Sequence, residues 1–231
     1  MTHDELLTRY AAGERDFRNA DLRGVDLAGV KLYGAILAGV NLTGANLSGT
    51  NLVRADLAGA NIRGANLTGA TLTEAILTGA DLIRATLAYA DLDIADLSRT
   101  NLTGANLSSA YLPGANLVDA ILAETILIKT NLIDAIIAKT KLPSPAMVLL
   151  AAWGRCSKNL TIELMRYDAS NHPKPARFDV WKKAGVCPFI GCLVDRSAHF
   201  SEIREWWSPG PAKPAYELMQ LVLKEKCDYT P

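Results

Sequence analysis

The stretch from residue 35 to residue 69 reads AILAG VNLTG ANLSG TNLVR ADLAG ANIRG ANLTG, seven consecutive blocks of five residues. A large aliphatic residue stands in the middle of every block, a small residue stands two places before it, and Asp or Asn stands between them in most blocks. The register continues unbroken from Phe17 to Leu142, which makes 26 blocks. Apart from Phe17, Ile62 and Ile137, every central residue is Leu.

A period of five residues fits neither a helix nor a flat strand. In an α-helix, successive central residues would be rotated by about 140° and would not share a face. In a flat strand, an odd spacing would send them alternately to opposite faces. A chain that turns a corner every five residues points all of them at one axis. Four corners close a square coil of about 20 residues, and stacked coils pair like parallel strands about 4.8 Å apart.

Glycine recurs two residues after the central Leu, where the square coil has to turn. In a turn from Leu to the next Ala, this is the second central residue, at which a type II turn requires positive φ. Corners such as Arg54, Glu74, Arg84, Ile94 and Lys129 carry a side chain instead. We therefore expect type II corners mainly in the early coils, and corners without positive φ where glycine is missing.

The A(D/N)LXX pattern over residues 15–142 resembles that of the pentapeptide-repeat family. The resemblance implies a mainly β fold, a right-handed quadrilateral β-helix of about 6.5 coils and roughly 30 Å in length. Residues 6–17 (LLTRYAAGERDF) are also similar to the N-terminal cap of cyanobacterial members of this family, such as the regulator of heterocyst differentiation.

The open ends of a β-helix need caps, because they expose unpaired backbone and apolar core. Thr2 and Glu5 have the spacing of a capping box, and Gly13 suits the end of a short helix. We expect an N-terminal helical cap over residues 1–14, the β-helix over 15–142 and a C-terminal domain over 143–231.

The C-terminal segment differs from the repeats in composition, since it holds all the Trp and Cys residues. Apolar residues spaced by three and four predict an α-helical domain. The predicted helices cover residues 146–153, 160–167, 178–184, 200–207 and 214–226.

Outward positions of the last coils become apolar, which solvated faces seldom do. These candidate interdomain or dimer contacts are Ile121, Ile126, Ile128, Ile133 and Ile136. Either the C-terminal domain docks on these coils in a monomer, or the chain forms a homodimer through its C-terminal region.

The cysteines are the side chains best suited to bind a metal or to act in catalysis. Their spacing argues against a metal site. Structural zinc sites pair short spacings such as two CxxC motifs, whereas Cys187 and Cys192 form one CxxxxC and Cys156 and Cys227 are isolated. Free thiols, a disulfide and a metal site remain alternatives. His172 and His199 lie near carboxylates, but no surrounding motif assembles a catalytic site. We expect no cofactor and no enzymatic activity.

Charge and hydropathy restrict the partners. Lys plus Arg and Asp plus Glu each number 24, which argues against a nucleic-acid partner. There is no apolar segment of signal-peptide or membrane-spanning type, so we expect a cytoplasmic protein with no membrane partner.

Three functions are compatible with these features. The favoured one is a non-enzymatic protein–protein interaction scaffold, whose partner is an unidentified protein. The candidate partner-binding residues interrupt the Gly-rich pattern and are Ile83, Arg84, Tyr89, Asp93, Ile94 and Arg99. The resemblance implies a DNA-mimicking, gyrase-binding protein as an alternative, although residues 15–142 carry nearly equal numbers of acidic and basic side chains. An unrecognised enzymatic or zinc-binding activity in the C-terminal domain is the third.

Overall fold

The computed structural model describes residues 1–144, 157–171, 208 and 210–226. Three helices are described, α1 (His3–Ala11), α3 (Lys158–Asn171) and α6 (Ala215–Lys226). The four cysteines lie outside the described residues, as do the helices predicted at 146–153, 178–184 and 200–207.

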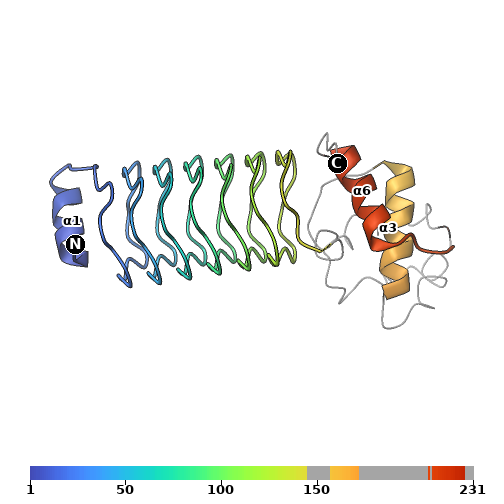
Figure 1. Ribbon diagram of the computed structural model, residues 1–231, viewed down its shortest axis with the longest axis horizontal. Helices are drawn as coiled ribbons and strands as arrows, with labels where there is room; N and C mark the ends of the chain where they lie inside the picture. The colour runs from blue at the N-terminus through green and yellow to red at the C-terminus, as the bar shows by residue number, and fades with distance from the viewer. Residues whose placement is uncertain (145–156, 172–207, 209, 227–231) are drawn as a thin grey trace.

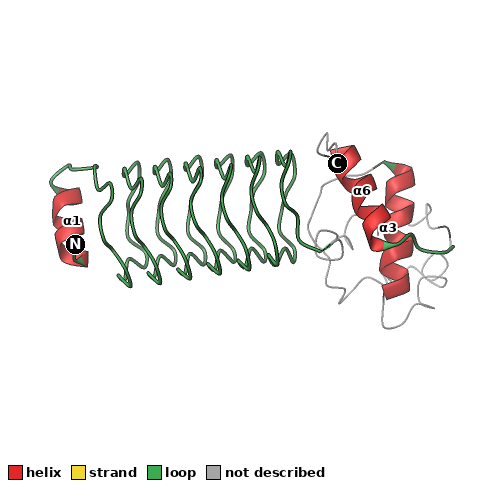
Figure 2. Ribbon diagram, in the orientation of Figure 1, coloured by secondary structure: helices red, strands yellow, loops and turns green. Residues whose placement is uncertain are grey.

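Between α1 and the C-terminal helices the chain winds as a stack of square coils (Figure 1). Single-residue parallel bridges join residues twenty apart, from Asp16 with Ile36 to Ile121 with Lys141. Each side of the square is too short for a longer strand, so the ribbon is drawn as loop throughout the coils (Figure 2). The predicted 20-residue coil is therefore confirmed.

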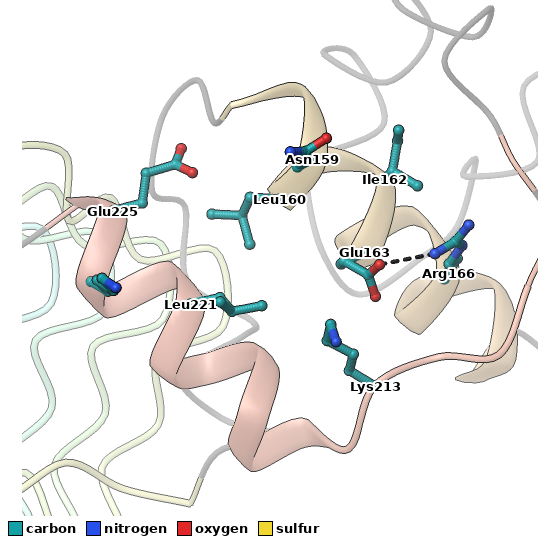
Figure 3. Close-up of a pocket in the computed structure, with 9 residues that line it drawn as sticks. Asn159, Leu160, Ile162, Glu163, Arg166, Lys213, Leu221 and Glu225 are labelled. Atoms are coloured by element: carbon teal, nitrogen blue, oxygen red, sulfur yellow. Dashed lines mark hydrogen bonds and ion pairs between the residues drawn. The ribbon is translucent and has the colours of Figure 1, made fainter.

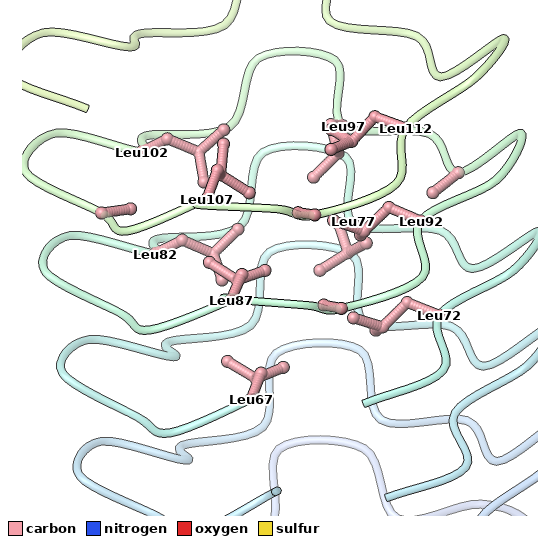
Figure 4. Packing of buried hydrophobic residues seen from close by; sticks show 14 of the residues in the cluster. Leu67, Leu72, Leu77, Leu82, Leu87, Leu92, Leu97, Leu102, Leu107 and Leu112 are labelled. Atoms are coloured by element: carbon pink, nitrogen blue, oxygen red, sulfur yellow. The ribbon is translucent and has the colours of Figure 1, made fainter. Parts of the chain in front are cut away.

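The inside of the coils is filled by the central residue of each block and the small residue before it. Central residues from Phe17 to Ile137 are at most 3% exposed, and the Leu side chains of successive coils lie above one another (Figure 4). Five threonines also face inward, and each hydroxyl donates to a backbone carbonyl, as Thr125 Oγ1 does to Leu102 O at 2.8 Å. A buried hydroxyl with a partner avoids the cost of an unsatisfied polar group.

The frequent Asp or Asn of each block has a structural role that the sequence did not reveal. Its side-chain oxygen accepts the backbone N–H two residues later, as in Asn101 with Thr103 at 3.1 Å and Asn116 with Val118 at 3.1 Å. This Asx turn satisfies an N–H on the outside of the coil, next to each corner.

The corner prediction was wrong for residues other than glycine. All corners from Asn19 to Lys139 have positive φ, and Arg54, Glu74, Arg84, Ile94 and Lys129 have φ between 55° and 58°. The reason is the turn that every block repeats. The N–H of the residue after the corner donates to the carbonyl of the central residue at glycine and non-glycine corners alike, as Ala45 does to Leu42 O at 3.0 Å and Thr130 to Leu127 O at 3.2 Å. Up to Asp119 the corner N–H also bonds to the next coil, as Arg84 does to Thr103 O at 3.0 Å. The repeated turn sets one corner conformation, although it costs about 1–2 kcal/mol at a residue with a Cβ.

Helix α1 lies across the first coil (Figure 1). Thr2 Oγ1 accepts the Glu5 N–H at 3.2 Å, and Gly13, with φ 93°, follows the helix in a Schellman motif. Leu6 is fully buried.

Carbonyls of the first coil have no preceding coil to pair with. Three of them accept hydrogen bonds from this segment instead: Asp21 O from the Met1 amino group, Asp26 O from His3 Nδ1 and Tyr33 O from the Tyr10 hydroxyl.

Helices α3 and α6 pack against each other beyond the last coil (Figure 1). Buried residues on the two helices include Leu160, Leu164, Leu218 and Val222. The Ser157 hydroxyl, just before α3, donates to Glu225 of α6 at 2.6 Å. These helices cover the predicted segments 160–167 and 214–226. The three-domain division of the whole chain stays a prediction.

Candidate functional site

The outer surface of the coils is organised in columns. Because residues twenty apart are bridged, a column contains positions such as 54, 74, 94 and 114. The four corner columns can be named after one member each, in order around the square: the Arg84, Tyr89, Ile94 and Arg99 corners. The interior of the coils is filled by buried side chains. Within the part of the chain that the structure describes, a surface for ligands or partners therefore lies on these columns or on the helices.

The structure separates the residues that the sequence groups together. Arg84 and Ile94 stand at diagonally opposite corners, and so do Tyr89 and Arg99, because five residues advance the chain by one corner. Ile83 adjoins Arg84, and Asp93 adjoins Ile94. One flat partner surface cannot touch all six residues, although Tyr89, Asp93 and Ile94 share one face. Their role in binding stays a prediction.

Exposed apolar residues are concentrated on one side of the coils. The exposed large apolar side chains of the coils are Tyr33, Ile36, Ile76, Tyr89, Ile94, Tyr111 and Ile136. All but Tyr89 lie at the Ile94 corner or on one of the two faces that meet there. Tyr89 lies at the neighbouring corner. Around the diagonal Arg84 corner the outward positions of residues 21–106 are Asn, Asp, Thr, Gly and Arg, apart from Ile83. This grouping is invisible in the linear sequence, because its members are up to about a hundred residues apart.

Three successive coils pass the Ile94 corner at residues 71–76, 91–96 and 111–116, and each of these segments is called a rung. We call the outward residues of these three rungs the apolar edge. Ile76, Ile94 and Tyr111 are 45%, 61% and 48% exposed. Ile94 is the one β-branched residue among the positive-φ corners of the described residues, with φ 55°. A β-branched residue rarely adopts this conformation, and such outliers concentrate at functional positions.

Carboxylates surround these apolar residues. The edge carries Glu74, Asp91, Asp93 and Asp96 but no Lys or Arg. The cations of the coils from residue 71 to 116 are Arg84 and Arg99, at other corners.

Two of the carboxylates are held in place by the coils next to them. Thr73 Oγ1 donates to Asp91 at 3.2 Å, and Thr78 Oγ1 donates to Asp96 at 2.9 Å. Partial burial raises the pKa of Asp96, but its hydrogen bonds from Ser98, Thr78 and Asn116 outweigh this, and the net pKa is lowered. Both side chains are oriented before any partner arrives.

The preceding coil adds a bridging cation. Arg54 donates to Glu74 at 2.9 Å and to the Tyr33 hydroxyl at 3.1 Å, which together raise the pKa of its guanidinium. The same contact lowers the pKa of Glu74. Three coils are thereby linked along the Ile94 corner.

The candidate interdomain residues encircle the last coils and do not form one patch. Ile121, Ile126, Ile128 and Ile133 are half-buried and belong to three faces, and Ile136 on the fourth face is 52% exposed. Their proposed contact with the C-terminal segment or a second chain stays a prediction.

An open groove of about 630 Å³ lies between α3 and α6 (Figure 3). Its lining combines Leu160, Ile162 and Leu221 with acidic and basic side chains. Arg166 is paired with Glu163 at 2.9 Å and donates to Ser208 O at 3.0 Å. Alternating charges single out no class of ligand.

Two kinds of feature are absent from the described part of the chain. No His, Cys, Asp and Glu side chains there gather in a group that could hold a metal. No helix there has the length and hydropathy needed to cross a membrane.

Comparison with known proteins identifies the family. A model of pentapeptide repeats matches eight copies, over residues 16–39, 35–73, 65–104 and 100–137, together more than half of the chain. No curated protein matches the chain.

Solved structures of pentapeptide repeat proteins are also similar to this chain. One from the Arabidopsis thaliana thylakoid lumen is 35% identical over 42% of this chain and 68% of its own, with a TM-score of 0.42. Rfr23 from the cyanobacterium Cyanothece 51142 is 27% identical over 65% of this chain and 99% of its own, with a TM-score of 0.43. HetL from Nostoc sp. strain PCC 7120, involved in heterocyst differentiation regulation, is 25% identical over 65% of this chain and 92% of its own, with a TM-score of 0.36. On the strength of the repeat match, this chain belongs to the pentapeptide-repeat family.

Proposed function

We propose that this protein is a non-enzymatic interaction scaffold, in which the stacked coils form a stiff rod that presents side chains to a protein partner. The observation that carries the proposal is the gathering of exposed apolar residues on one side of an otherwise polar rod. Exposed apolar groups without a partner inside the chain are typical of interaction surfaces. The proposal also includes the division into an N-terminal cap, a β-helix and a C-terminal domain.

The alternative of a DNA-mimicking, gyrase-binding protein receives less support. Mimicry of DNA requires negative charge along the whole rod. Here Asp16 and Asp21 of the first coil are paired with Arg18 and Arg23, and Asp81 is paired with Arg63. Acidic side chains are concentrated at one corner over two rungs, 71–76 and 91–96, which suits a local contact better than a DNA-like surface.

Affinity capture tests the scaffold proposal. The full chain, immobilised through its C-terminus, is exposed to lysate of its native cells, and bound proteins are identified after mild cross-linking. The proposal predicts a specific protein, captured in stoichiometric amount and competed by soluble full-length chain. Capture of no protein above the background of an unrelated β-helix would overturn it.

A further inference from the structure

Ile94 combines a strained corner conformation with an exposed side chain. Its φ of 55° is strained for a β-branched residue, and its side chain is 61% exposed. The neighbour one coil on is glycine, and Ile94 Cγ1 lies 3.6 Å from where a Cβ of Gly114 would be. Glycine at position 94 would satisfy the corner without strain. The corner conformation thus requires no side chain at position 94, and the exposed isoleucine is available for a contact outside the chain.

The surroundings of Ile94 define what can bind there. Ile76 on the preceding rung and Tyr111 on the following rung continue the exposed apolar surface along the rod. Asp91 and Asp96 flank Ile94 in its own coil and are fixed by Thr73 and Thr78. The Asp93 carboxylate has no bonding partner among the described residues. A complementary partner combines apolar side chains with Lys or Arg on both sides of them.

The spacing of the coils favours one secondary structure for that partner. Rungs repeat about every 4.8 Å, and a helix laid along the rod returns the same face about every 5.4 Å. Over three rungs the two repeats stay nearly in phase. Backbone pairing contributes little here, because the coil N–H groups on this edge are used in the ladder and in Asx turns.

We propose that the apolar edge binds a basic amphipathic helix of a protein partner, with an apolar residue against Ile94 and cationic residues facing Asp91, Asp93 and Asp96. This rests on the proposed scaffold function and names the surface and the chemistry of the partner. Long-range attraction to the carboxylates speeds association and makes it sensitive to salt.

The test uses a synthetic amphipathic helix of Leu and Lys, of about 18 residues or roughly five turns, and a matched helix of Leu and Glu. Binding to the full-length chain is measured by calorimetry at low and high salt. We expect the Leu/Lys helix to bind, more weakly at high salt, and the Leu/Glu helix not to bind. Equal binding of both helices would overturn the proposal.

Three variants locate the contact. Ile94→Gly removes the apolar side chain at a position that favours glycine, so the fold is retained, and Asp93→Lys reverses one charge. We expect each to weaken binding about tenfold, as loss of one well-placed contact does. The matched control is Arg84→Gly, the same kind of change in the same coil at the diagonal corner, φ 56°, and it should bind like the wild type. If Ile94→Gly bound as the wild type does, the edge would not be the site.

The same variants separate this inference from the scaffold function. If the partner captured from lysate were lost with Arg84→Gly and kept with Ile94→Gly, the chain would be a scaffold that uses another corner. If the wild-type chain captured no partner at all, the scaffold function itself would fail.

Discussion

At the scale of single residues, the corners show how a repeat overrides local preference. The same positive-φ conformation is adopted by glycine, at Gly59 for example, and by Arg54, Glu74 and Tyr89. Each corner is fixed by its own turn, and up to Asp119 also by a hydrogen bond to the next coil. Glycine is thus favourable at a corner but is not required.

A corner substitution measures this cost. A Cβ at Gly59 would have no atom within 4 Å, so Gly59→Ala changes only the backbone preference. We expect the free energy of unfolding to fall by about 1 kcal/mol, the difference between the left-handed strain of Ala and the greater entropy of unfolded Gly. Urea denaturation measures it, with Ala58→Gly, at the neighbouring turn position, as a control for chain entropy. An unchanged stability of Gly59→Ala would contradict the account.

Asp96 gives the rod a dependence on pH. Its pKa is lower in the folded state than in the unfolded chain, so its contribution to stability is present above the unfolded pKa of about 3.9 and is lost as pH falls through the folded pKa. We therefore expect the midpoint of urea denaturation to fall below about pH 4. Asp96→Asn should show a smaller decrease over this range. An equal decrease in the variant would assign the effect to other carboxylates.

Much of this residue-scale detail could be predicted from the sequence, and some could not. The Leu and Ala columns, the glycine corners and Gly13 after α1 follow from composition and turn chemistry. The positive φ at Arg54 or Ile94 could not, because the turn that recurs at every corner of the coil goes against the local preference of these residues. The Asx turns are hidden for a different reason: Asp and Asn stand in most blocks, but the N–H that each accepts is defined only once the corner has formed.

At the scale of elements, the single coil is the stabilising unit. Its four large central side chains contact those of the coils above and below, so a cavity in a middle coil is bounded by packed coils that cannot collapse easily. Leu82 in a middle coil is fully buried. We expect Leu82→Ala to cost about 2–5 kcal/mol in unfolding free energy.

Position within the stack provides the control for this substitution. Leu22 belongs to the first coil, whose outer side contacts the cap segment and not another coil. Leu22→Ala should cost less than Leu82→Ala, because the end of the stack can relax. Equal or reversed costs in chemical denaturation would mean that the coils do not stabilise one another as supposed.

At the scale of the whole molecule, α1 closes one end of the stack. Leu6 is buried, and hydrogen bonds from Met1, His3 and Tyr10 occupy carbonyls of the first coil. Removal of residues 1–13 leaves these carbonyls and the inward side chains of the first coil uncovered. We expect the shortened chain to self-associate, measured by sedimentation, with the more polar Leu6→Ser as a milder variant. A truncated chain that sediments like the full-length protein would contradict the role of α1.

The whole-molecule scale is also where the sequence was least informative about function. Residues 83–99 looked like one patch because they are close in sequence. In the coil, position around the rod depends on the remainder after division by twenty, so Arg84 and Ile94 lie at opposite corners while Ile76, Ile94 and Tyr111 lie along one edge. The apolar edge becomes visible only when the outward residues, like the inward ones, are aligned by the 20-residue period of the coil.

Hydroxyl-radical footprinting of the full-length chain with the Leu/Lys helix tests this organisation most directly. The method reads the exposure of Ile and Tyr side chains individually. The account predicts that Ile76, Ile94 and Tyr111 are protected together, although about eighteen residues separate each from the next, while Ile83 reacts as in the unbound chain. Protection of Ile83 together with Ile94, and not of Ile76 and Tyr111, would contradict it.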